Sequence, residues 1–310
     1  MLNVTLIIVQ SLNGLQLGIT LFLFAAGLTL VLGIMNVINL AHGSFYMIGA
    51  YYATTFTGWT GSFLLGLGLT VPAVFVTSLL IERVAISPLY SKDHLEQVLA
   101  TFGLILFLNE LVRIVWGPDG LNINVPDYLA GSVQIIPGVI YPVYRLTMMA
   151  VGLLVALLLY VLIARTRLGM VIRAGASNRE MVEAVGIDIR LVFSLIFALG
   201  AVLAGLAGGL AGPIFTVEPG MGDNVLILAL VTIVVGGIGS IRGSFFAAIL
   251  LGLLDALGRG FLPALLATQL PRAIADAAGP AIGSILIYVL MATVLFFRPQ
   301  GLFPVQGRSA

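Results

Sequence analysis

Long runs of apolar residues, separated by short polar stretches, make up most of this chain. A run of roughly 20 apolar residues crosses the about 30 Å of hydrocarbon in a bilayer as a helix. The pattern predicts nine segments, at about Leu12–Leu32, His42–Trp59, Phe63–Ile81, Val98–Trp116, Tyr144–Ile163, Leu191–Gly212, Val225–Gly239, Gly243–Gly260 and Pro280–Phe297. These runs are too long and too uniformly apolar for a β-barrel. We therefore expect an all-α fold, a polytopic membrane helical bundle that forms a single domain over residues 1–310.

Two places in this pattern are irregular. Val225–Gly239 is short and ends in Gly-Gly-Ile-Gly, and Ile34–Ala41 contains Asn36 and Asn39. Helices that break inside a membrane are typical of transporters. The expectation is therefore about eight or nine transmembrane segments with broken or re-entrant helices.

Composition agrees with the pattern and excludes several kinds of chemistry. Hydrophobic residues are 60% of the 310 residues, the mean hydropathy is +1.15, and the net charge of +1 indicates no attraction to nucleic acid. The absence of cysteine excludes disulfides and thiol catalysis. The N-terminus lacks the basic region and cleavage site of a secretory signal, so the first segment is expected to be retained.

Basic residues indicate the orientation of the segments. They gather in four regions: Arg83 with Lys92, the five arginines of residues 164–190, Arg242, and Arg298 with Arg308. All four fall on one side if nine segments cross and the N-terminus is outside. By the positive-inside rule that side is cytoplasmic, and the C-terminus lies there too.

The polar island at residues 164–190 holds five of the thirteen arginines: Arg165, Arg167, Arg173, Arg179 and Arg190. Within it, Ser177 and Glu180 have the spacing of a capping box. Gly186 stands where a left-handed residue would end the helix. The pattern predicts a short helix outside the bilayer, capped at both ends.

Two interpretations of the island remain. Arginines at a cytoplasmic loop follow from topology alone, but topology does not explain a capped helix. Met181, Val182 and Val185 give this helix only a short apolar face, too small for a membrane-surface helix and large enough to enter a cleft of a partner. We favour docking to a partner protein.

Polar side chains also gather at the first break, where Asn36, Asn39, His42 and Ser44 follow one another closely. They either satisfy backbone groups that the unwinding frees or face a polar pathway, and both hypotheses stay open. The stretch from His42 to Tyr46 resembles that from Arg242 to Phe246, which suggests an internal repeat or a chance match.

No catalytic constellation is visible in the sequence. The chain has one lysine and no phosphate-binding loop, its two histidines form no HExxH motif, and Gly-x-Ser-x-Gly is absent. We expect a non-enzyme with no metal site. Two charged pairs, Glu110 with Arg113 and Asp255 with Arg259, are interpreted as ion pairs at the ends of their helices or as lining of a permeation path.

Three blocks of sequence carry a family resemblance: GLTLVLGIMNVINLAHGSFYMIGAYYA at Gly27–Ala53, HLEQVLATFGL at His94–Leu104 and RAGASNREMVEAVGID at Arg173–Asp188. In this order they resemble the permeases of branched-chain amino acid ABC importers, and most of all the shorter of the two permeases that such systems pair. Glu183-Ala184 followed by Gly186 matches the EAA-like loop of ABC permeases loosely. The resemblance implies an ATPase-coupling helix comprising Ser177, Asn178, Arg179, Glu180, Met181, Val182, Glu183, Ala184, Val185 and Gly186.

The resemblance also implies partners and a location. A second, homologous permease subunit would complete a heterodimer in the bacterial inner membrane, and a periplasmic binding protein would deliver the solute. ATP and Mg would be held by two cytoplasmic ATPase subunits, with no cofactor on this chain. Branched-chain or other hydrophobic amino acids are the expected substrates. Alternatives are urea or short amides, aromatic or dicarboxylic acids, and a stand-alone secondary transporter or channel.

Overall fold

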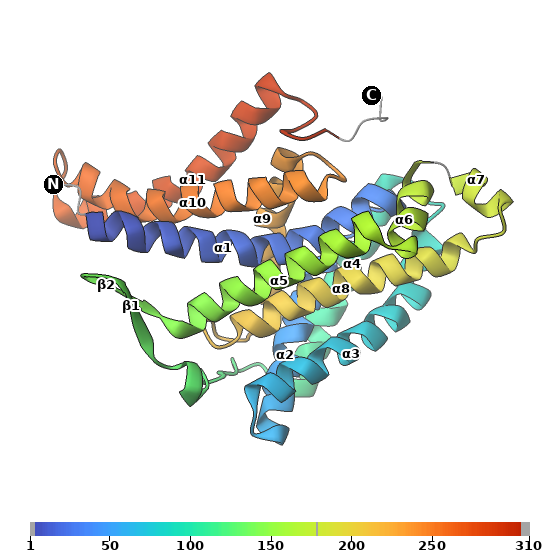
Figure 1. Ribbon diagram of the computed structural model, residues 1–310, viewed down its shortest axis with the longest axis horizontal. Coiled ribbons are helices and arrows are strands. Elements are labelled where there is room, and N and C mark those ends of the chain that lie inside the picture. The colour runs from blue at the N-terminus through green and yellow to red at the C-terminus, as the bar shows by residue number, and fades with distance from the viewer. Residues whose placement is uncertain (1–3, 178, 305–310) are drawn as a thin grey trace. The chain divides into compact units, whose positions relative to one another are not determined.

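A computed structural model describes residues 4–177 and 179–304, apart from the side chains of residues 176–180 (Figure 1). Its α-helices are α1 (Val4–Leu30), α2 (His42–Thr60), α3 (Phe63–Ile81), α4 (His94–Trp116), α5 (Val143–Arg165), α6 (Arg167–Ser177), α7 (Arg179–Ala184), α8 (Ile189–Ala211), α9 (Met221–Gly236), α10 (Ile241–Leu266) and α11 (Arg272–Phe297). Each of the nine predicted segments falls on one of these helices. The all-α prediction is therefore confirmed.

Short irregular elements join several of these helices. Two π-helices, η1 (Val31–Met35) and η2 (Glu82–Ile86), extend α1 and α3, and two 3₁₀ turns are η3 (Ser87–Leu89) and η4 (Asp127–Leu129). Among the described residues, seven helices are long and apolar enough to cross a membrane; α2 is not one of them, and α9 is a shorter apolar helix. The protein is thus a multi-pass membrane protein, and eight or nine segments remains a prediction.

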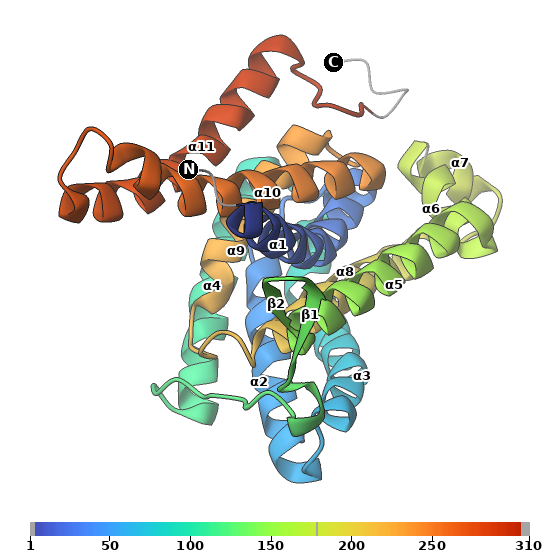
Figure 2. The ribbon, with the colours of Figure 1, turned by 60° about the vertical axis from the view of Figure 1, so that its left-hand side comes forward.

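A β-hairpin between α4 and α5 was not predicted (Figure 2). Strands β1 (Ser132–Ile136) and β2 (Val139–Pro142) pair antiparallel, with an irregularity between Gln134 and Ile136. Gly138 makes the turn with a φ of 85°. Val139 and Tyr141 of β2 are buried, whereas every residue of β1 is exposed.

The chain divides into two compact units, each assembled from segments far apart in the sequence. Unit 1 contains residues 1–22, 127–153 and 229–305, and unit 2 contains residues 23–126, 154–228 and 306–310. Helices α1, α5 and α9 each run from one unit into the other. No single point in the sequence therefore separates the two units, and one permease domain over the whole chain stays a prediction.

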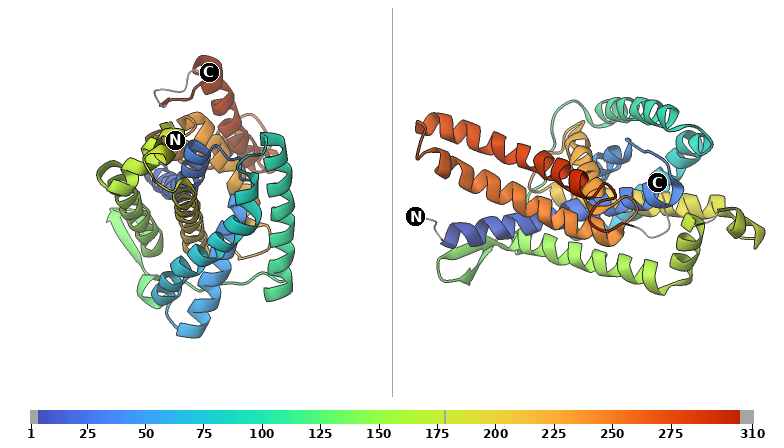
Figure 3. Two further views of the ribbon diagram at one scale, coloured as in Figure 1. Left: turned by 90° about the vertical axis from the view of Figure 1, so that its right-hand side faces the viewer. Right: turned by 90° about the horizontal axis from the view of Figure 1, so that it is seen from above.

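Unit 1 is built around α10 and α11, which pack side by side (Figure 3). Gly258 of α10 lies against Gly283 of α11, where an added Cβ would be 3.2 Å from the facing Cα. The first part of α1 packs on α10 in the same manner, with Gly14 and Gly18 against the α10 backbone. Small residues at such interfaces let helix backbones approach closely, which is the main source of helix association in lipid.

Unit 2 is built around α2, which packs against α3 and α8 and is buried over most of its length. Gly49 of α2 faces Gly205 of α8. A Cβ added to Gly49 would collide with the Gly205 backbone, and one added to Gly205 would meet the side chain of Val74. Ala201, Gly205 and Gly209 have small-xxx-small spacing along α8, which permits this close packing. An edge-to-face contact between Phe45 and Phe197, with ring centroids 5.6 Å apart, fills the adjacent space.

Candidate functional site

The polar island contains two helices, where a single one was predicted. Helix α6 leaves the end of α5, and the shorter α7 follows it. Gly169 lies against the carbonyl groups of Leu162 and Ile163, and the Arg173 guanidinium donates to the Ile163 carbonyl, so α6 is folded back onto α5. The prediction missed α6 because its two glycines lower helix propensity and its polar residues suggested a loop.

Helix α6 is amphipathic and packs against both η1 and α8. Gly169, Ile172 and Gly175 recur at intervals of three and are buried, while the intervening arginine is exposed. A Cβ at Gly175 would lie 3.1 Å from the Cδ1 atom of Ile189 in α8. Helix α6 therefore connects α7 to η1, at the end of α1.

The predicted C-terminal cap of α7 is confirmed at Gly186. Its φ is 81°, its N–H donates to the Glu183 carbonyl at 2.9 Å, and the Ile187 N–H donates to the Val182 carbonyl at 3.3 Å. These two bonds form a Schellman motif. Two residues later the Asp188 carboxylate caps α8 by accepting from the Arg190 and Leu191 N–H groups at 2.9 and 3.3 Å.

The N-terminal half of the predicted helix is less well covered. Ser177 is the last residue of α6, whereas the sequence predicted it as the N-terminal cap of a single short helix. Asn178 lies outside the described residues, as do the side chains of Ser177, Arg179 and Glu180. The capping box of Ser177 and Glu180 therefore stays a prediction.

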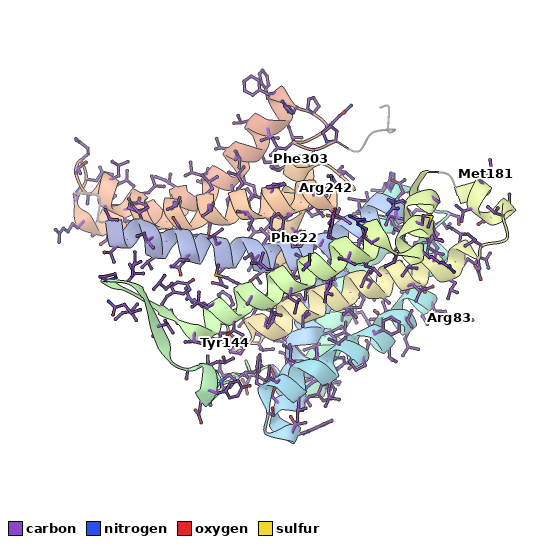
Figure 4. The ribbon with its side chains drawn as sticks, in the orientation of Figure 1. Phe22, Arg83, Tyr144, Met181, Arg242 and Phe303 are labelled. Atoms are coloured by element: carbon purple, nitrogen blue, oxygen red, sulfur yellow. The ribbon has the colours of Figure 1, made fainter. Side chains whose placement is uncertain are left out.

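The apolar face of α7 separates into a buried and an exposed part. Val182 is buried at 4% exposure, whereas Met181 and Val185 are 65% and 73% exposed. Ala184 and Glu183 are exposed as well. Met181 and Arg83, which follows α3, lie toward the same end of unit 2 (Figure 4). Met181 and Val185 thus present two large apolar side chains, one turn apart, at this end.

The break between α1 and α2 lies where the sequence placed it. After η1, Asn36 takes a left-handed conformation with φ 55°, the only positive φ outside glycine among the described residues. The Ile38 N–H donates to the Gln97 Oε1 at 3.0 Å, and the Leu40 N–H donates to the Thr101 Oγ1 at 3.3 Å. Two N–H groups of the break are therefore bound by side chains of α4.

The four polar residues predicted at the break have different environments. His42 is buried, with its Nε2 3.2 Å from the Phe24 carbonyl and its ring 4.9 Å from the Phe24 ring. Asn36 is exposed and Ser44 is buried. Asn39 is 1% exposed, and neither the nitrogen nor the oxygen of its amide has a hydrogen-bond partner among the described residues.

The family model described as "Branched-chain amino acid transport system / permease component" matches residues 10–295. The chain belongs to this permease family.

Its relatives in the family match it from end to end. The chain is similar to BraD, the high-affinity branched-chain amino acid transport system permease protein of Pseudomonas aeruginosa, with 33% identity over 94% of both chains. It is similar to LivH of Escherichia coli strain K12, with 31% identity over 94% of this chain and 96% of the relative. It is 26% identical to a probable LivH of Methanocaldococcus jannaschii. No solved structure matches it.

In this permease, one buried acidic residue escaped the sequence analysis. Glu82 begins η2 and is 4% exposed. One carboxyl oxygen accepts the Tyr90 hydroxyl, and the other accepts the Ser194 hydroxyl at 2.9 Å. Glu82 thereby joins the end of α3 to η3 and to the first turns of α8. A polar residue beside Arg83 at the end of an apolar run was the available signal, but its partners are distant in sequence.

The permease also holds the two charged pairs singled out in the sequence. Arg113 and Glu110 are 3.8 Å apart and both are more than half exposed. Arg259 Nε lies 2.8 Å from Asp255 Oδ1, and the Asp255 side chain is 12% exposed. Each acid therefore has its basic partner on its own helix, which agrees with the interpretation as local ion pairs.

Proposed function

We propose that this permease is the membrane-spanning subunit of an ATP-driven importer that translocates branched-chain or other hydrophobic amino acids delivered by a periplasmic binding protein. Family membership supports this proposal, and so do the titles of its relatives. The observation that carries the ATP-driven mechanism is α7, a short helix that ends in a Schellman motif and exposes Met181 and Val185.

The proposal includes an assembly and an orientation. A second homologous permease completes the pathway as a heterodimer, and two ATPase subunits, which hold ATP and Mg, bind α7 on the cytoplasmic side of the bacterial inner membrane. The positive-inside rule supports this side for α7, with the N-terminus periplasmic and the C-terminus cytoplasmic. Asn36, Asn39, His42 and Ser44 are the candidate residues of the substrate pathway.

The contacts of α6 and α8 suggest how the ATPases drive transport. When ATP closes the ATPases, their docking clefts move and carry α7 with them. Because only residues 185–188 separate α7 from the capped start of α8, and α6 packs against η1, the displacement acts on the ends of α1 and α8 together. ATP hydrolysis itself takes place on the partners.

Reconstitution in proteoliposomes tests the proposal. Complexes with both ATPases, the partner permease and the binding protein should accumulate leucine, isoleucine or valine only when ATP is supplied on the ATPase side. Uptake without ATPases would overturn it in favour of a stand-alone carrier. Uptake of urea in place of amino acids would contradict the proposed substrate class.

A triple variant tests the coupling helix, with Ser177→Ala, Glu180→Ala and Gly186→Ala. We expect ATP hydrolysis to continue while uptake falls, because a frayed α7 transmits less displacement. The matched control is Gly61→Ala, another left-handed glycine that ends a helix, at the end of α2 (φ 67°). Equal uptake by the triple variant and the wild type would contradict the role of α7.

A further inference from the structure

Asn39 carries the one amide among the buried side-chain groups that lack a hydrogen-bond partner in the described part of the chain, whereas the others are hydroxyl groups, among them those of Tyr51 and Thr57. Its amide carries two donors and two acceptor lone pairs, and in a 1% exposed position all of them lack a partner among the described residues. Buried polar groups in native proteins are nearly always hydrogen-bonded, so an exception calls for an explanation. In an apolar bundle that explanation is a ligand, a water molecule or a defect.

The break itself does not need this amide. Gln97 and Thr101 of α4 already bind the N–H groups on either side of Asn39. Gln97 is used in full, because its Nε2 also donates to the carbonyls of Leu89 and Lys92 at 3.2 and 3.1 Å. The neighbouring His42 bonds to the Phe24 carbonyl. Hydrogen bonds of the neighbouring residues therefore hold the backbone around Asn39 in place, and the Asn39 side chain takes no part in them.

The surroundings of Asn39 determine which ligand suits it. Residues 31–41 contain no Asp, Glu, Lys or Arg. A ligand with net charge would be left without a counter-ion there, and burying such a charge is costly. Because Asn39 is 1% exposed in the single chain, a ligand reaches it only when the permease changes conformation during transport. The ligand that fits is a small solute with no net charge that both donates and accepts hydrogen bonds.

We propose that the Asn39 amide binds the head group of a zwitterionic α-amino acid during its passage, donating to the carboxylate and accepting from the ammonium group. This inference rests on the proposed function and adds the chemical group that is recognised. The head group is common to all α-amino acids, so Asn39 contributes equally for every side chain. A single neutral amide also holds the solute weakly enough to release it.

The experiment uses Asn39→Leu in the reconstituted complex, since leucine has nearly the same size and no polar atom. We expect the purified complex to be at least as heat-stable as the wild type, because an unpaired buried amide is removed. Uptake per folded complex should fall about tenfold or more, the loss typical of hydrogen bonds to charged groups. The fall should be the same for leucine, isoleucine and valine.

Thr70→Val is the matched control. Thr70 is buried in α3 and its hydroxyl bonds to the Gly66 carbonyl of its own helix at 2.9 Å, so this variant also removes a buried polar atom from a span. Its uptake should equal that of the wild type.

Three results would overturn the inference while leaving the proposed function intact. Wild-type uptake in Asn39→Leu would mean that the amide holds only a water molecule or nothing. Lower heat stability would mean that it has a structural partner. Unequal losses for the three amino acids would mean that it contacts the side chain of the solute. Absence of ATP-dependent uptake in the wild type overturns both proposals together.

Discussion

Two membrane helices end alike within unit 2, each near a buried polar side chain. They differ in whether that side chain has hydrogen-bond partners. Helix α1 ends in η1 and α3 in η2, each a five-residue π-helix that packs against α8. Beside η2, both carboxyl oxygens of Glu82 accept hydroxyl groups. After η1, the Asn39 amide has no partner among the described residues.

The difference follows from the free energy of removing each group from water. A carboxyl group that can ionise is far more costly to bury than a neutral amide, so it needs partners within the fold. An unpaired amide costs about 1–3 kcal/mol, a smaller cost that this bundle bears at Asn39 and, for hydroxyl groups, at Tyr51 and Thr57 as well. The paired residue is therefore a structural joint, and under the proposal above the unpaired amide of Asn39 is a place that a solute visits.

The largest effect is expected for Glu82→Ala. It removes two hydrogen bonds, leaves the Tyr90 and Ser194 hydroxyls without their acceptor, and opens a cavity between α3 and α8. The free energy of unfolding in detergent should fall by about 3 kcal/mol, measured by thermal or denaturant unfolding. If Glu82→Ala is as stable as Asn39→Leu, the distinction between the joint and the visited site is wrong.

Gln97→Leu acts on both regions, since this side chain links the break after η1 to η3 and the turn before α4. It leaves one N–H and two carbonyl groups without their partner. We expect the free energy of unfolding to fall by about 2 kcal/mol. Amide hydrogen exchange of the folded protein should be faster at Ile38. Unchanged exchange there would show that the break is held by other contacts.

Tyr90→Phe removes one of the two donors to Glu82 and keeps the ring that packs edge-to-face on Phe193 at 5.6 Å. The expected loss is about 1–1.5 kcal/mol, smaller than that of Glu82→Ala because the Ser194 hydroxyl remains. A loss equal to that of Glu82→Ala would mean that Ser194 contributes nothing to the joint.

These residues also mark how far the sequence could predict the molecule. The helices were predictable because an apolar run of the right length has one solution in a bilayer, and Gly186 was predictable because left-handed caps favour glycine. The hairpin was missed although Pro-Gly between β-branched residues marks a turn. The Glu82 joint was out of reach, since Tyr90 and Ser194 lie 8 and 112 residues away in the sequence.

At the candidate site the sequence predicted which residues are polar, but not which of their side chains are hydrogen-bonded within the fold. Asn36, Asn39, His42 and Ser44 were indistinguishable as a cluster, because pattern shows which residues are polar and not which of them find partners. The partner of the His42 ring lies outside the cluster, at the Phe24 carbonyl. Only the three-dimensional arrangement separates His42, whose ring is bound, from Asn39, whose amide side chain has no partner among the described residues.

The smallest effect is expected for Thr101→Val, which tests whether the break depends on Asn39 after all. The Leu40 N–H bond to Thr101 is long, at 3.3 Å, and valine fills nearly the same volume, so the loss should be about 0.5–1 kcal/mol. Uptake by Thr101→Val should stay near wild type, because the Asn39 amide is untouched. If uptake instead falls as far as in Asn39→Leu, the conformation of the whole break determines passage of the amino acid, and not the amide alone. The contrast with Glu82 would then be one between a flexible and a rigid helix end.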